Sequence, residues 1–279
     1  MSDKRLLLGS DYDGTFRRWG DVPEKEDIDA VKKFRSRGNI FGIVTGRTPA
    51  EMCWVLEQFG DICDFLLCAT GGVCMFPDKS IAFTSEAPAD DLPELRRICL
   101  EHGSVHVHSD AMSLSDEFAT MEELYLAFPG DVEGEARFHV NGYIDGFAHC
   151  LAIHPDGMKH IRGITQFTSY FNGSEDCVKT IEAIDAAFPG KYKCHYLGNG
   201  FDMTAAKVSK TDGIARVAKH FGIEHDCIYT AGDGWNDVDM LRSYHGISMS
   251  GTGQGIMDSA EWVYDTVGEA IYSLLLTEE

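Results

Sequence analysis

The strongest constraint on how this chain folds is a series of short apolar segments that each stop at polar or acidic residues. Residues 6–10, 40–44 and 65–69 are such segments, and stretches with helical periodicity separate them. A fourth, residues 227–231, follows another helical stretch late in the chain. Strands of a parallel sheet have this composition because helices cover both faces. The alternation therefore predicts an α/β domain built on a parallel sheet.

Residue types that start and stop helices stand at the ends of the periodic stretches. Thr48, Pro49 and Glu51 form a capping box with proline at the first helical position. Another periodic stretch opens at Lys210 and ends at Gly222, a residue type that commonly follows the last helical turn. Helices at these places supply the crossovers that parallel strands require.

The pattern changes between residues 78 and 203. Apolar and polar residues alternate there, as in residues 105–108, and Asn-Gly and Pro-Gly pairs punctuate the segment. Such alternation predicts half-exposed strands of an antiparallel sheet. We therefore predict a discontinuous core domain of residues 1–77 and 204–279, with an α+β domain of residues 78–203 inserted into it.

Charge and cysteine usage limit the partners and the compartment. The chain has 24 basic and 45 acidic residues, a net charge of −21, which argues against nucleic acid or an acidic membrane surface as partner. No apolar run approaches the roughly 20 residues that span a bilayer. The nine cysteines form no C-x-x-C pair, as expected of reduced thiols in a cytoplasmic protein. Nothing indicates an obligate protein partner.

Four carboxylates follow predicted strands, at the sheet edge where ligands bind in open α/β folds. Asp11 and Asp13 are two residues apart, so their side chains share a face of an extended segment. Asp233 and Asp237 follow the fourth apolar segment. Carboxylates gathered together repel one another unless a cation joins them, and oxygen ligands favour Mg²⁺. The sequence predicts a Mg²⁺ site there, which in turn points to phosphoryl chemistry.

Two donors suited to a phosphoryl group accompany these carboxylates. Thr45 follows the second predicted strand, and Lys210 opens a predicted helix. Lys207 is an alternative to Lys210, which we favour because Lys207 precedes a Val-Ser step and not the helix. Simpler interpretations also exist, since Asp-Gly is a common turn pair and Asp237 suits the first turn of a helix.

Taken in order, these clusters resemble the four motifs of the haloacid dehalogenase (HAD) superfamily. Residues 11–15, Asp-Tyr-Asp-Gly-Thr, are similar to its D-x-D-G-T signature. Residues 45–47 (Thr-Gly-Arg), Lys210 and residues 232–237 (Gly-Asp-Gly-Trp-Asn-Asp) resemble the second, third and fourth motifs. The insert resembles the large α+β cap, class C2B, of the Cof-type or class IIB subfamily. The resemblance covers essentially the whole chain and implies a Rossmann-like core with an inserted cap.

The resemblance also implies a role for each matching residue. Asp11 is the expected nucleophile, which forms an aspartyl-phosphate, and Asp13 the expected acid and base. Mg²⁺ is expected on Asp11, the main-chain carbonyl of Asp13 and Asp233, with Asp237 as a direct or indirect support.

The remaining matches are expected to hold the substrate. The resemblance implies that Thr45, the amide of Gly46 and Lys210 bind the phosphoryl oxygens. The resemblance also implies that Asn236 contacts phosphate or orients a neighbouring group, and that Arg47 meets the substrate at a position that varies within the family.

These expectations favour a Mg²⁺-dependent phosphatase acting on a small phosphorylated metabolite, with sugar phosphates as the expected class. Asp13 supports hydrolysis, because transport ATPases of the superfamily carry Thr at that position and keep the aspartyl-phosphate longer. Two alternatives are a phosphomutase of the phosphomannomutase type and a non-catalytic sensor that binds phosphometabolites.

Two groups in the insert allow more than one interpretation. His106 and His108 share a face of a predicted strand, and a solvated face explains them better than a metal site, because no third ligand is evident. Phe167, Tyr170 and Phe171 either line the substrate side or form the apolar face of a core helix.

Overall fold

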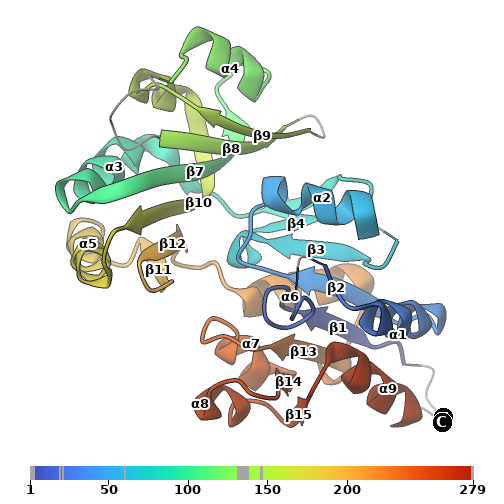
Figure 1. Ribbon diagram of the computed structural model, residues 1–279. Helices are drawn as coiled ribbons and strands as arrows, with labels where there is room; N and C mark the ends of the chain where they lie inside the picture. Colours follow the sequence, from blue (N-terminus) through green and yellow to red (C-terminus); the bar gives the residue numbers. More distant parts are fainter. Residues whose placement is uncertain are drawn as a thin grey trace. The chain divides into compact units, whose positions relative to one another are not determined.

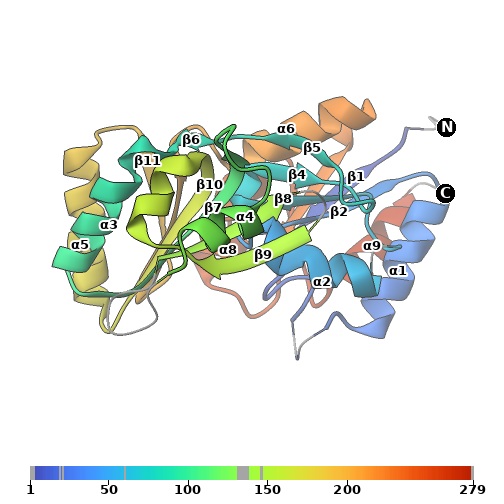
Figure 2. The same cartoon turned by 90° about the horizontal axis from the view of Figure 1, so that it is seen from above.

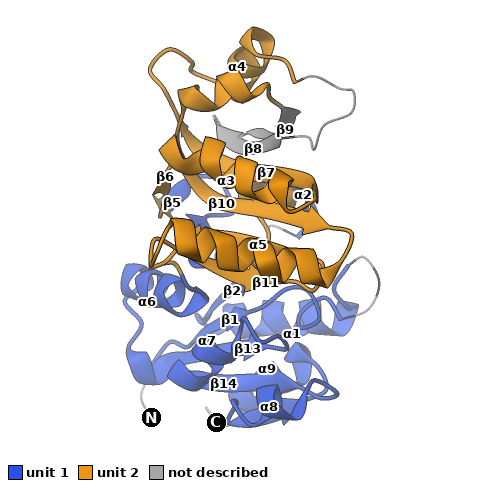
Figure 3. Cartoon of the chain, turned by 90° about the vertical axis from the view of Figure 1, so that its left-hand side faces the viewer, with its two compact units in different colours: residues 1–45, 54–82, 209–279 blue, residues 46–53, 83–208 orange. Residues whose placement is uncertain are grey.

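The computed structural model describes residues 4–18, 20, 22–59, 61–130, 138–144 and 147–277 (Figure 1). The chain divides into two compact units, which Figure 3 colours separately. Unit 1 consists of residues 1–45, 54–82 and 209–279, and unit 2 of residues 46–53 and 83–208. The predicted domain boundaries at residues 77/78 and 203/204 stay a prediction.

Unit 1 is built on a sheet with the strand order β15-β14-β13-β1-β2-β3-β4-β5. Its strands are β1 (Leu7–Ser10), β2 (Ile40–Val44), β3 (Phe65–Cys68), β4 (Val73–Met75), β5 (Ile81–Thr84), β13 (Ile228–Gly232), β14 (His245–Met249) and β15 (Trp262–Tyr264). Pairing is parallel from β15 through β3, and β4 runs antiparallel to β3. The predicted parallel α/β core is confirmed.

Helices cover both faces of this sheet. They are α1 (Lys25–Ser36), α2 (Pro49–Phe59), α6 (Lys210–Phe221), α7 (Val238–Ser243), α8 (Gln254–Met257) and α9 (Val267–Thr277), with the short 3-10 turns η1 (Ala69–Gly71) and η4 (His225–Cys227). The first five residues of α2, 49–53, belong to unit 2. Helices α1 and α9 lie side by side on one face, and α6 lies on the other (Figure 2). Helix α6 buries Ile214, Val217 and Ala218, which places its apolar side against the sheet.

The predicted helix ends are present. The Thr48 amide donates to Glu51 Oε2 (2.8 Å), and the Glu51 amide donates to Thr48 Oγ1 (3.2 Å), which completes the capping box of α2. Gly222 follows α6 with a φ of 68°, a left-handed conformation that favours glycine.

Unit 2 contains a sheet with the strand order β11-β12-β10-β7-β8-β9, with β6 paired to β10. Its strands are β6 (Ala87–Pro88), β7 (Ser104–Leu114), β8 (Phe138–Ile144), β9 (Phe147–Ala152), β10 (Ile161–Phe171), β11 (Tyr192–Tyr196) and β12 (Gly200–Ala205). Its helices are α3 (Leu92–Glu101), α4 (Met121–Ala127) and α5 (Ser174–Ala187), with the turns η2 (Ala89–Asp91) and η3 (Pro155–His160). Strands β7 and β8 pair in parallel, unlike the antiparallel pairs around them, and the segment between them contains α4.

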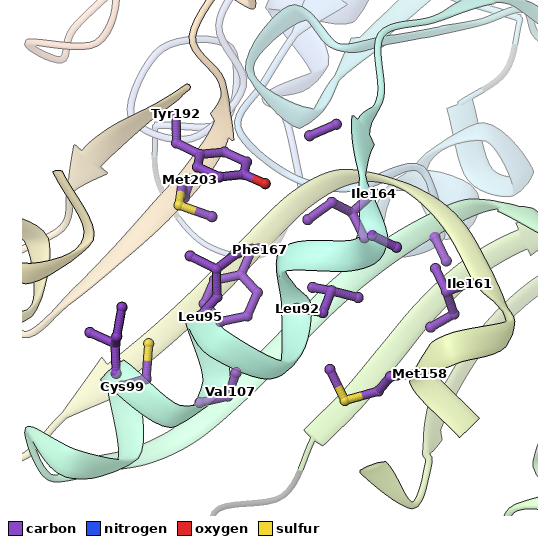
Figure 4. Packing of buried hydrophobic residues seen from close by; sticks show 14 of the residues in the cluster. Leu92, Leu95, Cys99, Val107, Met158, Ile161, Ile164, Phe167, Tyr192 and Met203 are labelled. Atoms are coloured by element: carbon purple, nitrogen blue, oxygen red, sulfur yellow. The ribbon is translucent and has the colours of Figure 1, made fainter. Parts of the chain in front are cut away.

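The core of unit 2 forms where helix α3 packs on the sheet. Leu92 and Leu95 of α3 join Val107, Phe167 and Met203 from β7, β10 and β12 in one buried cluster (Figure 4). The burial of these side chains on one sheet face agrees with the alternation seen in the sequence.

The suggestion of a core helix around the aromatic residues was wrong, because these residues lie on β10. Phe167 and Phe171 are buried, whereas Tyr170 is 36% exposed. A spacing of four residues keeps two side chains on one face of a strand as well as of a helix, so the aromatic spacing could not distinguish the two.

Two further observations concern the helices and the cysteines. In the described part of the chain, no helix has both the length and the apolar composition to cross a membrane. Eight cysteines among the described residues are free thiols.

Candidate active site

Three carboxylates meet at the carboxyl ends of β1 and β13. Asp11 directly follows β1, and its amide donates to the Ala231 carbonyl of β13 (2.8 Å), which holds the two strand ends together. One oxygen from each of Asp11, Asp233 and Asp237 lies within 4.8 Å of the others. The fold therefore brings together acidic residues that are more than 200 positions apart in the chain.

Lys210 lies among these carboxylates. Its Nζ donates to Asp11 Oδ1 and to Asp237 Oδ1, each at 2.6 Å, and the residue is only 2% exposed. Lys207, the alternative considered from the sequence, is exposed in unit 2. The structure thus gives the buried position to the lysine that begins α6.

Burial and neighbouring charges set the electrostatics of this group. Burial raises the pKa of Asp11, and the charges of Asp237 and Asp233 raise it further against the opposing effect of Lys210. Burial lowers the pKa of Lys210, but the two carboxylates outweigh that effect and keep it raised. Lys210 is accordingly a fixed cation.

Both oxygens of Asp237 already have partners. Oδ1 accepts from Lys210, and Oδ2 accepts from the amides of Asp233 (3.2 Å) and Gly234 (3.0 Å). Asp237 therefore orients the loop that carries Asp233 and fixes the lysine.

Thr15, in the first motif (residues 11–15), contacts Asp233 in the fourth motif (residues 232–237). The sequence interpretation missed this contact. Its Oγ1 donates to Asp233 Oδ1 at 2.6 Å. Gly14 before it has a φ of +87°, and a Cβ there would lie 2.2 Å from Asp233 Oδ2. The Gly-Thr pair after Asp13 is the signal in the sequence, because only glycine allows this approach.

Arg17 is a partner of Asp13 that the sequence interpretation also did not foresee. The guanidinium donates to Asp13 Oδ1 through Nε (3.1 Å) and through Nη2. The amide of Arg17 also donates to the Tyr12 carbonyl (2.7 Å), so the chain turns back immediately after the signature. Arg17 thereby fixes the orientation of the Asp13 carboxylate.

A strained turn supports Thr45 and the start of α6. The buried Thr45 accepts a hydrogen bond at its carbonyl from the Thr70 amide (3.0 Å). Ala69 and Thr70 have φ values of 49° and 55°, which are uncommon for residues with side chains. At Gly71, with a φ of +100°, a Cβ would lie 2.1 Å from the Ser209 carbonyl. Glycine is therefore required beside the residue that precedes Lys210.

The predicted substrate-binding residues fall in different units. Asn236 is exposed in unit 1, in the loop between Asp233 and Asp237. Gly46 and Arg47 belong to unit 2, where they line a cavity. Near this cavity, His106 Nε2 lies 3.0 Å from His108 Nδ1.

The donor set of unit 1 suits a divalent cation. Carboxylate oxygens are hard ligands, and burial and neighbouring carboxylates raise the pKa values of Asp11 and Asp233. A cation beside these oxygens would favour their ionised forms. The residues present therefore fit a metal site. The predicted ligand from Asp13 is its main-chain carbonyl and not its side chain.

The parallel sheet, the inserted α+β segment and the acidic strand ends together define a class of hydrolase. The sequence model of the haloacid dehalogenase-like hydrolases matches residues 8–273. The chain belongs to this family. A search of curated proteins gives no sequence match.

Solved structures share the fold over nearly the full chain. A haloacid dehalogenase-like hydrolase from Bacteroides thetaiotaomicron has a TM-score of 0.74 and 13% identity, covering 97% of this chain and 100% of that one. BT1666 from the same organism, described among the phosphatases of the HAD superfamily, has a TM-score of 0.70 and 19% identity, with coverages of 99% and 96%. The subclass IIB sugar phosphatase BT4131 has a TM-score of 0.67 and 17% identity, with coverages of 97% and 99%. The predicted HAD-type hydrolase fold is confirmed.

Proposed function

We propose that this protein is a Mg²⁺-dependent phosphatase that hydrolyses a small phosphorylated metabolite through an aspartyl-phosphate. The observation that carries the proposal is the buried contact of Lys210 with Asp11 and Asp237, beside Asp233. A nucleophilic carboxylate, a fixed cation and a further carboxylate at one sheet edge are the parts that phosphoryl transfer requires.

In the first step, a carboxylate oxygen of Asp11 attacks phosphorus and the ester P–O bond breaks. Asp13 gives its proton to the leaving oxygen. An ammonium group has three donors, and Asp11 and Asp237 accept from two of them. The third N–H of Lys210 and the Thr45 hydroxyl then stabilise charge on the phosphoryl oxygens.

In the second step, water attacks phosphorus, the bond to Asp11 breaks and Asp13 accepts the water proton. The base at position 13 favours hydrolysis over a long-lived intermediate. Asp11, Asp233 and the carbonyl of Asp13 would hold Mg²⁺, which supplies electrostatic stabilisation of phosphoryl charge. Asp237 acts through Lys210 and the Asp233 loop, because its two oxygens are engaged within the protein.

Sugar phosphates are the proposed substrate class. This part of the proposal is supported by the fold shared with BT4131, whose description is that of a sugar phosphatase. Gly46 and Arg47 are proposed substrate contacts, together with Asn236. The free cysteines favour a cytoplasmic site of action.

The test is phosphate release from a panel of phosphate esters, with Mg²⁺ and with EDTA. We expect turnover with Mg²⁺, loss with EDTA and recovery when Mg²⁺ is restored. Isomerisation of a hexose phosphate without phosphate release would identify a phosphomutase. Saturable binding without turnover of any ester would identify a sensor, and either result would contradict the proposal.

A further inference from the structure

A polar cavity of about 250 Å³ lies within unit 2. All of its lining residues belong to that unit, including Gly46, Arg47 and Glu51 from its first segment. Pockets for drug-sized ligands typically have volumes of about 300–1,000 Å³. The cavity is therefore suited to a small group, such as part of a monosaccharide.

One polar atom in this cavity lacks a partner. Gln166 is 3% exposed, and its Oε1 is buried without a hydrogen bond. The side chain of Gln166 donates to Asp202, so the amide nitrogen is the engaged end and the oxygen remains. A buried acceptor without a partner has lost the hydrogen bonds that it would make to water, and a ligand that donates a hydrogen bond restores one.

A partly buried carboxylate, that of Asp202, lies beside this atom. Asp202 accepts from Thr168 Oγ1 (2.7 Å) and from Gln166. Burial raises the pKa of Asp202 to about 6, and the charge of Glu51 contributes to the shift. The charges of both carboxylates also raise the pKa of Tyr170, after the effect of burial. The partly buried Asp202 and the exposed Glu51 thus both line this cavity.

Acceptors and negative charge are in excess in this cavity. Asp202, Glu51 and Gln166 Oε1 offer acceptor oxygens, whereas Arg47 is the one permanently cationic side chain among the described lining residues. Glu51 uses Oε2 for the Thr48 amide, which leaves Oε1 for a ligand. A carboxylate or second phosphate would meet two like charges here, whereas an ammonium group has three N–H donors and a compensating charge.

We propose that this cavity binds a protonated primary amine of the substrate, so that the enzyme prefers amino-sugar phosphates and similar aminated esters to their hydroxyl counterparts. The inference rests on the proposed phosphatase function. Gly46, which lines the cavity, directly follows Thr45 in the sequence.

The test compares kcat/KM within matched pairs, using the full-length protein with Mg²⁺ at pH 7.5. Glucosamine 6-phosphate is paired with glucose 6-phosphate, mannosamine 6-phosphate with mannose 6-phosphate, and 3-aminopropyl phosphate with 3-hydroxypropyl phosphate. We expect at least one pair to favour the amine by about tenfold or more, which corresponds to about 1.4 kcal/mol. N-acetylation, which removes the charge, should abolish that preference.

Two variants assign the preference to the cavity. Asp202→Asn and Glu51→Gln each remove one charge, and glutamine keeps the capping box of α2. Both should lower the amine-to-hydroxyl ratio severalfold, mainly through KM. Asp176→Asn, an exposed carboxylate at the start of α5, is the matched control and should leave the ratio unchanged.

The outcomes separate this inference from the proposed function. Phosphate release with hydroxyl esters favoured in every pair would overturn the amine pocket and leave the phosphatase intact. An amine preference that survives both substitutions would also overturn it. Failure to release phosphate from any ester would instead contradict the phosphatase itself.

Discussion

The candidate active site of unit 1 and the cavity of unit 2 both contain acidic residues, but those residues differ in the partners that they have. In unit 1, Lys210 and Thr15 provide partners for Asp11, Asp237 and Asp233 from within the chain. In unit 2, Gln166 Oε1 lacks a partner and two carboxylates outnumber one guanidinium. The difference fits the two proposals, a prearranged site for chemistry in unit 1 and a cavity in unit 2 whose polar groups a ligand would complete.

The largest expected effect tests the proposed catalytic role of the residues in unit 1. Asp11→Asn should lower kcat by about 10⁴-fold or more, because an amide does not replace the nucleophile. Lys210 keeps Asp237 as a partner, so the fold should survive. Steady-state kinetics and a melting curve check this, with the exposed Asp226→Asn as control; wild-type turnover would refute the assigned nucleophile.

Asp13→Asn should have the next largest effect, a loss of about 10²–10⁴-fold, the usual contribution of a general acid or base. If hydrolysis of the aspartyl-phosphate by water becomes slower than phosphoryl transfer to Asp11, the aspartyl-phosphate accumulates. Mass spectrometry of the acid-quenched protein should detect the added phosphoryl group. Unchanged turnover would remove Asp13 from the mechanism.

The raised pKa of Asp202, which lines the cavity, should make the free energy of unfolding depend on pH. A raised pKa means that native Asp202 binds its proton more tightly than in the unfolded chain, so the unfolding free energy falls as pH rises from about 4 to above 6. The shift to about 6 corresponds to about 3 kcal/mol at most. Relative to wild type, Asp202→Asn should therefore gain stability between pH 4 and pH 7.5.

Urea unfolding of both proteins at both pH values measures this gain. The groups that surround Asp202 are the titratable or charged side chains of Glu51, Arg47, His108, Tyr170 and His195. The difference between wild type and variant isolates Asp202, because the other groups titrate in both proteins. If the free energies of unfolding of wild type and Asp202→Asn differ by the same amount at both pH values, the pKa of Asp202 is not raised in the folded protein.

The smallest expected effect concerns the metal site. Thr15→Val removes the hydroxyl that orients Asp233, and loss of such a partner typically lowers metal affinity about 10–100-fold. Thr15→Ser keeps the hydroxyl and should retain the affinity. Calorimetric titration with Mg²⁺ distinguishes the two, and equal affinities would show that Asp233 needs no support from Thr15.

The residue pattern by itself predicted the parallel core, several helix ends and the acidic strand ends. Those features are local: buried strands are continuously apolar, and capping residues such as Thr48 and Gly222 bond within a few positions. The four ordered motifs also placed the chain in its family. Periodicity could not distinguish a helix from a strand where both place the same spacing on one face, as at Phe167 and Phe171.

Only the tertiary structure decided which groups meet. Thr15 lies 218 positions from Asp233, and Lys210 lies 199 positions from Asp11, so strand order and helix packing determine those contacts. The same holds for Glu51, Gln166 and Asp202, which three distant segments bring to one cavity. A local pattern records the face on which a side chain lies, whereas its partner depends on chain segments that fold against it from elsewhere.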